Sequence, residues 1–141
     1  MMQDCSSRKF SERVKQIGLP LDGIVVIGSG ILDQLGIRSA RDVDLVANRE
    51  LVSMLQENPL WTTSMDATGR VVSKKGDVEV WDGWELDDKV ADFITLTQDG
   101  VTYDDVRFVN LEFVLQWKRW RGREKDMIDV EKIRNYMRGA R

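Results

Sequence analysis

Three acidic residues occupy positions from which carboxylates can converge on a metal ion. Asp42 and Asp44 flank an apolar residue, an alternation typical of a strand with one buried face. Side chains at positions i and i+2 of a strand share a face, with Cα atoms about 6.6 Å apart, so both carboxylates can reach one or two cations. Glu79 lies on a second expected strand. Because clustered carboxylates repel one another without a cation, we predict that Asp42, Asp44 and Glu79 bind Mg²⁺ or Mn²⁺.

Other roles for these acids are also compatible with the sequence. Asp42 also fits an acidic residue in a turn, and Asp44 fits a solvent-facing residue of a strand. Asp77 and Asp82 compete with Glu79 as the third acid, but Asp77 falls where a hairpin should turn. Asp82 would face the other side of the sheet if the strand continues.

A glycine-serine turn lies upstream of the acids. Gly28 and Ser29 follow an apolar run, and a short helix is expected directly after them. Such a turn offers backbone amides, a hydroxyl and a helix dipole to a phosphate. The segment also starts like a dinucleotide-binding Gly-x-Gly-x-x-Gly motif, but Asp33 replaces the third glycine and would repel a pyrophosphate.

The composition narrows the possible chemistry. The chain has 141 residues, no histidine and one cysteine, Cys5. Serine–histidine and cysteine–histidine catalysis are therefore excluded, as are the usual zinc sites. Any reaction at this protein must then rely on groups such as carboxylates, lysines, arginines and a bound hard cation. A lone cysteine and the absence of a long apolar run favour a cytoplasmic protein without a membrane span.

Charge is unevenly distributed along the chain. Residues 117–141 contain nine of the 21 basic residues and only four of the 24 acidic ones. The rest of the chain is acidic, which argues against a broad nucleic-acid surface and leaves room for a local anion site. A solvated basic helix face explains the same pattern.

The expected elements describe one α/β domain over residues 1–141, of α+β type. Helices are predicted at 6–18, 31–36 and 49–57, with two more after residue 111 that separate near Gly122. Strands are predicted at 24–27 and 42–47, and hairpins at 70–74 with 78–81 and at 101–103 with 106–109. Residues 82–110 give no clear pattern apart from the second hairpin.

The arrangement resembles the nucleotidyltransferase superfamily, which includes polymerase β and the antibiotic nucleotidyltransferases. The family pattern is an apolar residue, Gly, Gly or Ser, a spacer of about a dozen residues and then Asp-apolar-Asp/Glu-apolar. Residues 27–29 and 42–45 match it. The resemblance implies a mixed, mostly antiparallel sheet flanked by helices, with two C-terminal helices like those of small bacterial members.

Site roles follow from the same resemblance. Gly28 and Ser29 would contact a nucleoside triphosphate, Asp42 and Asp44 would hold metal, and Glu79 would assist the attacking hydroxyl. The other expected triphosphate-binding residues are basic: Arg38 and Arg41 in the loop before the acids, and Lys118 and Lys125 in the C-terminal helices. Three basic residues of the tail are expected either to bind phosphate or to pair with Asp126 and Asp129: Lys118, Arg123 and Lys125. For the two lysines, an ordinary solvent-exposed surface position is the alternative. A base-stacking role for a tryptophan is a further option.

The expected activity is transfer of a nucleoside monophosphate from a triphosphate to an acceptor hydroxyl, with release of pyrophosphate. Acceptors in the family include small molecules, proteins and RNA. The chain lacks the extra helical domain of larger relatives, so a partner chain or a homodimer is expected to complete the site. The alternatives are a silent nucleotide- or partner-binding module, as in a toxin–antitoxin pair, and a kinase-like phosphoryl transfer.

Overall fold

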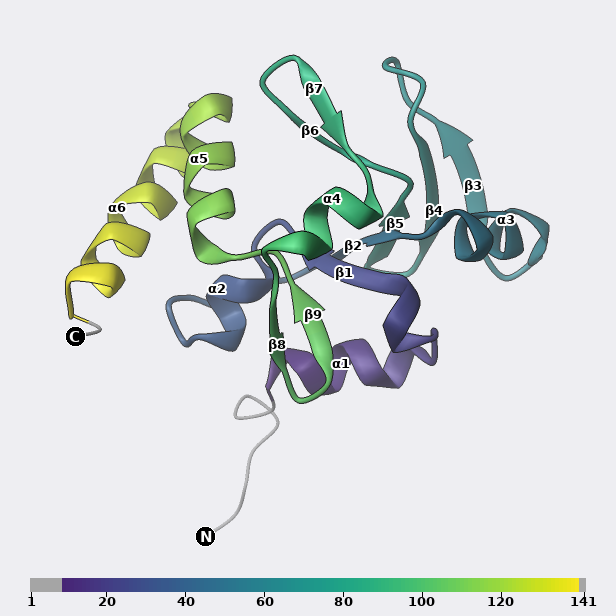
Figure 1. Cartoon of the computed structure of the whole chain (residues 1–141), viewed down its shortest axis with the longest axis horizontal. Helices are drawn as coiled ribbons and strands as arrows, with labels where there is room; N and C mark the ends of the chain where they lie inside the picture. The colour runs from purple at the N-terminus through teal and green to yellow at the C-terminus, as the bar shows by residue number, and fades with distance from the viewer. Residues whose placement is uncertain (1–8, 140–141) are drawn as a thin grey trace, which may run out of the picture.

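The computed structural model describes residues 9–139, and within that range the strands form one seven-stranded sheet and a separate two-stranded hairpin (Figure 1). The large sheet has the order β3-β4-β5-β2-β1-β9-β8. Its strands are β1 (Ile24–Ile27), β2 (Val43–Ala47), β3 (Thr62–Met65), β4 (Val71–Lys75), β5 (Val78–Trp81), β8 (Val101–Tyr103) and β9 (Val106–Phe108). The hairpin pairs β6 (Trp84–Leu86) with β7 (Lys89–Ala91).

The sheet is mixed and mostly antiparallel, as predicted. Four neighbouring pairs run antiparallel, namely β1 with β2, β3 with β4, β4 with β5, and β8 with β9. The two parallel pairs are β2 with β5 and β1 with β9. Both predicted hairpins are confirmed as β4–β5 and β8–β9.

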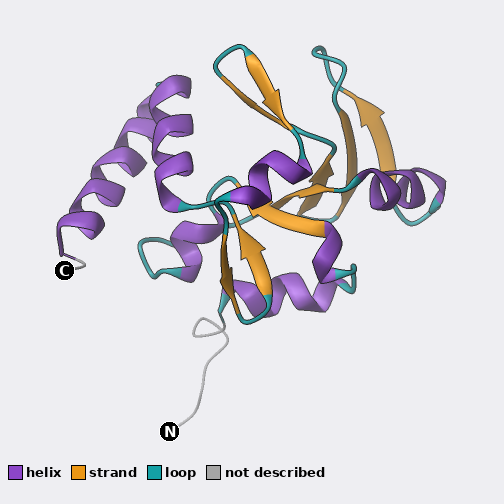
Figure 2. Cartoon of the chain, viewed as in Figure 1, coloured by secondary structure: helices purple, strands orange, loops and turns teal. Residues whose placement is uncertain are grey.

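Six α-helices flank this sheet in the described range (Figure 2). They are α1 (Phe10–Ile17), α2 (Gly30–Gln34), α3 (Arg49–Glu57), α4 (Phe93–Gln98), α5 (Leu111–Arg121) and α6 (Glu124–Gly139). A 3-10 turn, η2 (Leu21–Gly23), precedes β1. The helices α5 and α6 lie side by side at the end of the molecule opposite α3 and β3, and they confirm the expected C-terminal helix pair (Figure 1).

The central strands β1 and β2 carry the core. Every residue of β1 is buried, and Asp44 is the one residue of β2 that is not fully buried. The helix α2 packs against them at close range, since a Cβ added to Gly30 would come within 2.4 Å of Val26 and 2.7 Å of Phe10. One continuous apolar cluster extends from Phe10 to Ile133. The turn after β1 is therefore held tightly against the sheet.

The structure corrects several predicted boundaries. Asp42 precedes β2, which begins at Val43, and α2 ends at Gln34, two residues earlier than expected. The first helix begins at Phe10; residues 6–8 of the prediction, like Cys5, lie outside the described residues. Three strands and one helix were not predicted: β3, β6, β7 and α4. None of the described helices is long and apolar enough to cross a membrane.

Candidate active site

A cavity of about 490 Å³ lies between the end of β1, the loop before β2 and the two C-terminal helices. Eight of the nine predicted site residues line it: Gly28, Ser29, Arg38, Arg41, Asp42, Asp44, Lys118 and Lys125. These residues are separated by up to 97 positions along the chain, from Gly28 to Lys125, and the fold brings them to one place. The cavity is also lined by Trp117, one of the tryptophans for which base stacking was an option, and by Lys132, which the sequence did not single out.

Asp44 is the electrostatic centre of this cavity. Burial, followed by repulsion from Glu79 and Asp42, raises the pKa of Asp44 from 3.8 to about 7, against a lowering contribution from Lys118. A buried carboxylate near two others favours its neutral form unless a cation compensates the charge. The protein thus holds its acids in an arrangement that a bound cation would stabilise.

Glu79 lies beside Asp44 but outside the cavity wall. The two residues are Cα partners in the parallel pairing of β2 with β5. The Glu79 carboxylate is 3.7 Å from Lys74 Nζ and its side chain is 34% exposed. Glu79 is therefore an electrostatic neighbour of Asp44, and its role as the third acid stays a prediction.

The two competitors of Glu79 have structural partners. Asp77 lies in the β4–β5 turn, where its carbonyl accepts a hydrogen bond from Val43 N. The carboxylate of Asp82 accepts a bond from Val71 N at the other end of the hairpin. Neither lines the cavity, which agrees with the turn role expected for Asp77.

Gly28 makes the close approach between the turn and the acids possible. Its φ is +70°, a left-handed conformation that non-glycine residues seldom adopt. A Cβ added there would lie 3.0 Å from Asp44 Oδ2. Glycine at this position therefore serves both the backbone conformation and the placement of Asp44.

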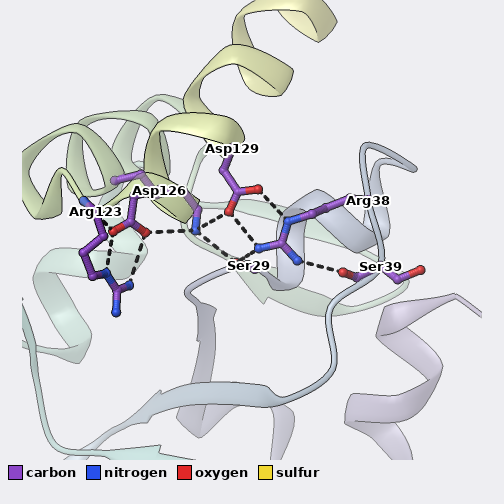
Figure 3. Close-up of polar contacts among 7 residues, drawn as sticks. Ser29, Arg38, Ser39, Arg123, Asp126 and Asp129 are labelled. Atoms are coloured by element: carbon purple, nitrogen blue, oxygen red, sulfur yellow. Dashed lines mark hydrogen bonds and ion pairs between the residues drawn. The ribbon is translucent and has the colours of Figure 1, made fainter.

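The Ser29 hydroxyl joins the glycine-serine turn to a network of buried charges (Figure 3). It accepts hydrogen bonds from Arg38 Nη2 at 2.9 Å and from Lys118 Nζ at 3.1 Å. Arg38 in turn makes two bonds to Asp129, from Nε at 2.6 Å and from Nη2 at 2.7 Å. Lys118 Nζ is 2.9 Å from the same carboxylate. The helix α2 contributes little to this turn because it has only five residues, so side chains replace the dipole that we expected.

A second carboxylate extends the network along α6. Asp126 is 3.9 Å from Lys118 Nζ and accepts a 2.6 Å bond from Arg123 Nε. The predicted pairing with Asp126 and Asp129 is thus confirmed for Lys118 and Arg123, whereas no such pair is found for Lys125 among residues 9–139. Burial raises the pKa values of Asp126 and Asp129, but bonds from Arg123, Arg38 and Lys118 hold them below the ordinary range. Burial lowers the pKa of Lys118 despite its hydrogen bond with Asp129.

Arg13, a residue that the sequence did not single out, holds the loop that leads to Asp42. It donates from Nη1 to the Ala40 carbonyl at 2.7 Å and from Nη2 to the Arg41 carbonyl at 2.6 Å. The same guanidinium is 3.4 Å from the Asp77 carboxylate. Arg13 lies in α1, far from the motif, and no spacing rule connects the two; the contact depends on the tertiary fold.

The remaining cavity cations are differently placed. Arg41, Lys125 and Lys132 are exposed, and no ion pair is found for them among residues 9–139. They contrast with Lys118, whose side chain is 4% exposed. The cavity thus combines an inner network of paired charges with exposed outer cations that make no ion pair among the described residues.

The acids fit a cation that takes part of its coordination from a ligand. Residues 9–139 contain no group of three or more His, Cys, Asp or Glu side chains arranged to hold a metal ion. Mg²⁺, however, is commonly bound through one or two carboxylates together with substrate phosphates and water. Asp42 and Asp44 both line the cavity and would be the two carboxylates of such a site.

Comparisons of this chain with protein-family models, curated proteins and solved structures find no match. The resemblance to nucleotidyltransferases therefore depends on the motif residues alone.

Proposed function

We propose that this chain is a metal-dependent nucleotidyltransferase that moves a nucleoside monophosphate from a triphosphate to an acceptor hydroxyl. The observation that carries the proposal is the meeting of the Gly28-Ser29 turn, Asp44 and Lys118 in one cavity. The turn and the lysine supply donors for an anion, while the acids supply ligands for a cation. A metal-bound triphosphate requires both within a few ångströms of each other.

Each residue has a specific part in this proposal. Asp42 and Asp44 would hold the cation, and the metal would neutralise phosphate charge and favour ionisation of the acceptor hydroxyl. Ser29 accepts two hydrogen bonds, so its own hydrogen is directed to a phosphate oxygen. Lys118 and Arg38 supply positive charge from a fixed position, which costs little reorganisation when the ligand arrives.

The test is calorimetric titration of ATP, GTP, CTP and UTP with Mg²⁺ into the wild type and the Asp44→Asn variant. Glu57→Gln, an exposed carboxylate at the end of α3, serves as the matched control. We expect Mg²⁺-dependent binding that Asp44→Asn loses and Glu57→Gln keeps. Equal binding by all three proteins, or binding without regard to Mg²⁺, would overturn the assignment of the cation to Asp44.

Product analysis separates the competing reactions. Pyrophosphate release with labelled nucleotide marks nucleotidyl transfer, whereas a nucleoside diphosphate marks kinase action. Metal-dependent binding without turnover of any tested acceptor would favour the silent binding module. The burial of Asp44 beside other acids favours the enzyme, since a protein that only binds a partner gains nothing from mutually repelling carboxylates.

A further inference from the structure

A second, smaller cavity of about 130 Å³ adjoins the first and is lined by aromatic and cationic side chains. We call it the tryptophan slot and define it by Trp81, Trp84, Trp117, Trp120, Arg70 and Arg121. Trp117 also lines the larger cavity, so its indole belongs to the walls of both. Four of the five tryptophans of the chain thus surround one small space.

From this arrangement we infer that the tryptophan slot binds the nucleobase of the triphosphate whose phosphates occupy the larger cavity. The inference depends on the proposed function for the identity of the ligand. Its support lies in the shape, the charges and the position of the slot.

The rings of the slot are packed against one another and against cations. Trp84 lies 5.8 Å from Trp81 and 5.2 Å from Trp117, measured between ring centroids. The Arg70 guanidinium is 4.6 Å from the Trp81 ring, and Arg121 is 5.4 Å from the Trp117 ring. The Trp81 and Trp84 rings meet edge to face at 78°, and the Trp84 and Trp117 rings are tilted at 47°. Aromatic faces and guanidinium groups are surfaces on which a nucleobase can stack. The volume is below that of typical small-molecule sites, so the slot suits one ring system and not a whole nucleotide.

Two residues that line the slot have indole nitrogens without a hydrogen-bond partner among the described residues. These nitrogens, in Trp81 and Trp84, are buried. Buried indole N–H groups normally find an acceptor, and leaving one unpaired is destabilising. Glu85, which also lines the slot, adds an acceptor for an exocyclic amino group. Nucleobases carry both ring or carbonyl acceptors and amino donors, whereas a purely apolar ring carries neither.

The two cavities match the two ends of one ligand. Trp117 and Lys118 are neighbours on α5, and the Lys118 ammonium is 5.1 Å from the Trp117 ring. Trp117 lines the slot, and Lys118 donates a hydrogen bond to Ser29 in the larger cavity. A nucleoside triphosphate likewise joins a flat ring to a polyanionic chain. The helix α5 therefore presents a group for the ring, Trp117, next to a group for the phosphates, Lys118.

The experiment compares nucleoside triphosphates with inorganic tripolyphosphate, which has the phosphate chain but no ring. Both are titrated with Mg²⁺ into the wild type and into the double variant Trp120→Ala, Arg121→Gln. These two residues are exposed, Trp120 at 38%, so their loss should spare the fold. Arg119→Gln, exposed on the same helix and outside both cavities, is the matched control.

We expect the wild type to bind at least one nucleoside triphosphate about tenfold tighter than tripolyphosphate, in line with a stacking gain of ~1–3 kcal/mol per base. The double variant should lose most of that difference and bind tripolyphosphate as the wild type does. An unchanged ratio in the double variant, or equal affinities in the wild type, would overturn the slot as a base site.

Absence of a triphosphate site in the larger cavity gives a different result, because neither nucleoside triphosphate nor tripolyphosphate would then bind, whereas a kinase or a silent nucleotide-binding module would still bind both. If neither ligand binds, binding of free nucleosides tests whether the slot is a ring site. Adenosine, guanosine, cytidine and uridine are observed by ligand-detected NMR against the wild type and the double variant. Contact signals that the double variant loses support a ring site, and their absence in the wild type rejects it.

Discussion

Glu79 lies directly opposite Asp44 across the parallel pairing of β5 with β2. The pairing brings two acidic side chains from separate segments to neighbouring strands, and Asp42 approaches from the loop before β2. Repulsion among the three contributes to the raised pKa of Asp44. The three acids should therefore affect the pH dependence of the protein's stability even without a ligand.

The first prediction concerns the pH dependence of stability. Because the pKa of Asp44 is about 7 in the folded state and 3.8 ordinarily, the folded chain keeps a proton that the unfolded chain releases. The free energy of unfolding should therefore fall as pH rises from about 4 to about 7, by up to about 1.4 kcal/mol for each pH unit. Asp44→Asn should lack this contribution.

Thermal melting of the two proteins between pH 4 and pH 8 in the presence of EDTA measures the difference. Glu79→Gln should move the upper end of the falling range to lower pH, because it removes one source of repulsion. Parallel curves for the wild type and Asp44→Asn would contradict the burial of this carboxylate.

The second prediction separates backbone strain from steric contact at Gly28. Gly28→Ala and Gly36→Ala both place a side chain in a left-handed conformation, with φ of +70° and +76°. Each should cost about 1–2 kcal/mol of stability for that reason. Only the Cβ at position 28 meets Asp44, whereas nothing lies within 4 Å at position 36.

Binding of Mg²⁺ with nucleoside triphosphate should therefore be lost in Gly28→Ala and kept in Gly36→Ala. Calorimetry measures the binding, and urea denaturation measures the stability. Equal binding by the two variants would show that the contact with Asp44 does not matter.

A third prediction addresses the buried charges. Asp129→Asn removes the carboxylate that pairs Arg38 with Lys118, and it leaves the buried ammonium with the Ser29 hydroxyl at 3.1 Å and, among the described residues, only the Asp126 carboxylate at 3.9 Å. Removing one partner of a buried ion pair typically costs about 3–5 kcal/mol. Urea denaturation should show a loss of this order, while Glu131→Gln, exposed on the same helix, should stay within about 0.5 kcal/mol of the wild type. Similar losses in both variants would refute the structural role of Asp129.

The fourth prediction makes Arg13 a positioning residue. Arg13→Gln removes two hydrogen bonds to the carbonyls of Ala40 and Arg41, so the loop before Asp42 should loosen. We expect faster hydrogen exchange of the amides at 40–43 and weaker binding of the Mg²⁺–triphosphate complex. Lys15→Gln, exposed on the same helix, is the control. Weaker binding with unchanged exchange would point to a direct contact with the ligand instead.

The sequence predicts the central part of this fold because the relevant signals are local. The buried run 24–27, the hairpin turns and the glycine at position 122 each specify their own element. The strand β3 is missed because its residues, Thr62–Met65, are largely exposed and carry no alternation. The short elements β6, β7 and α4 have at most six residues each, too few for a periodic pattern.

The site was predictable to the extent that it follows one motif. Eight motif and tail residues meet in the cavity because the turn after β1 and the loop before β2 lie at the same end of adjacent strands. The contribution of Arg13 depends on how α1 packs, and the tryptophan slot depends on where β6 meets α5. Such contacts between distant segments have no signature in sequence spacing.

The sharing of Asp126 and Asp129 among Arg38, Lys118 and Arg123 has a consequence for behaviour in salt. Exposed lysines attract polyanions through a long-range electric field. Dissolved ions screen this field, and at physiological ionic strength the screening length is about 8 Å. The cations here are largely compensated before a ligand arrives, and the buried Lys118 is shielded from solvent. Under the proposed function, the inner cations Arg38 and Lys118 would act through short directed bonds, and only the exposed Arg41, Lys125 and Lys132 are open to screening. Binding should therefore weaken less in concentrated salt than binding to an open basic surface does.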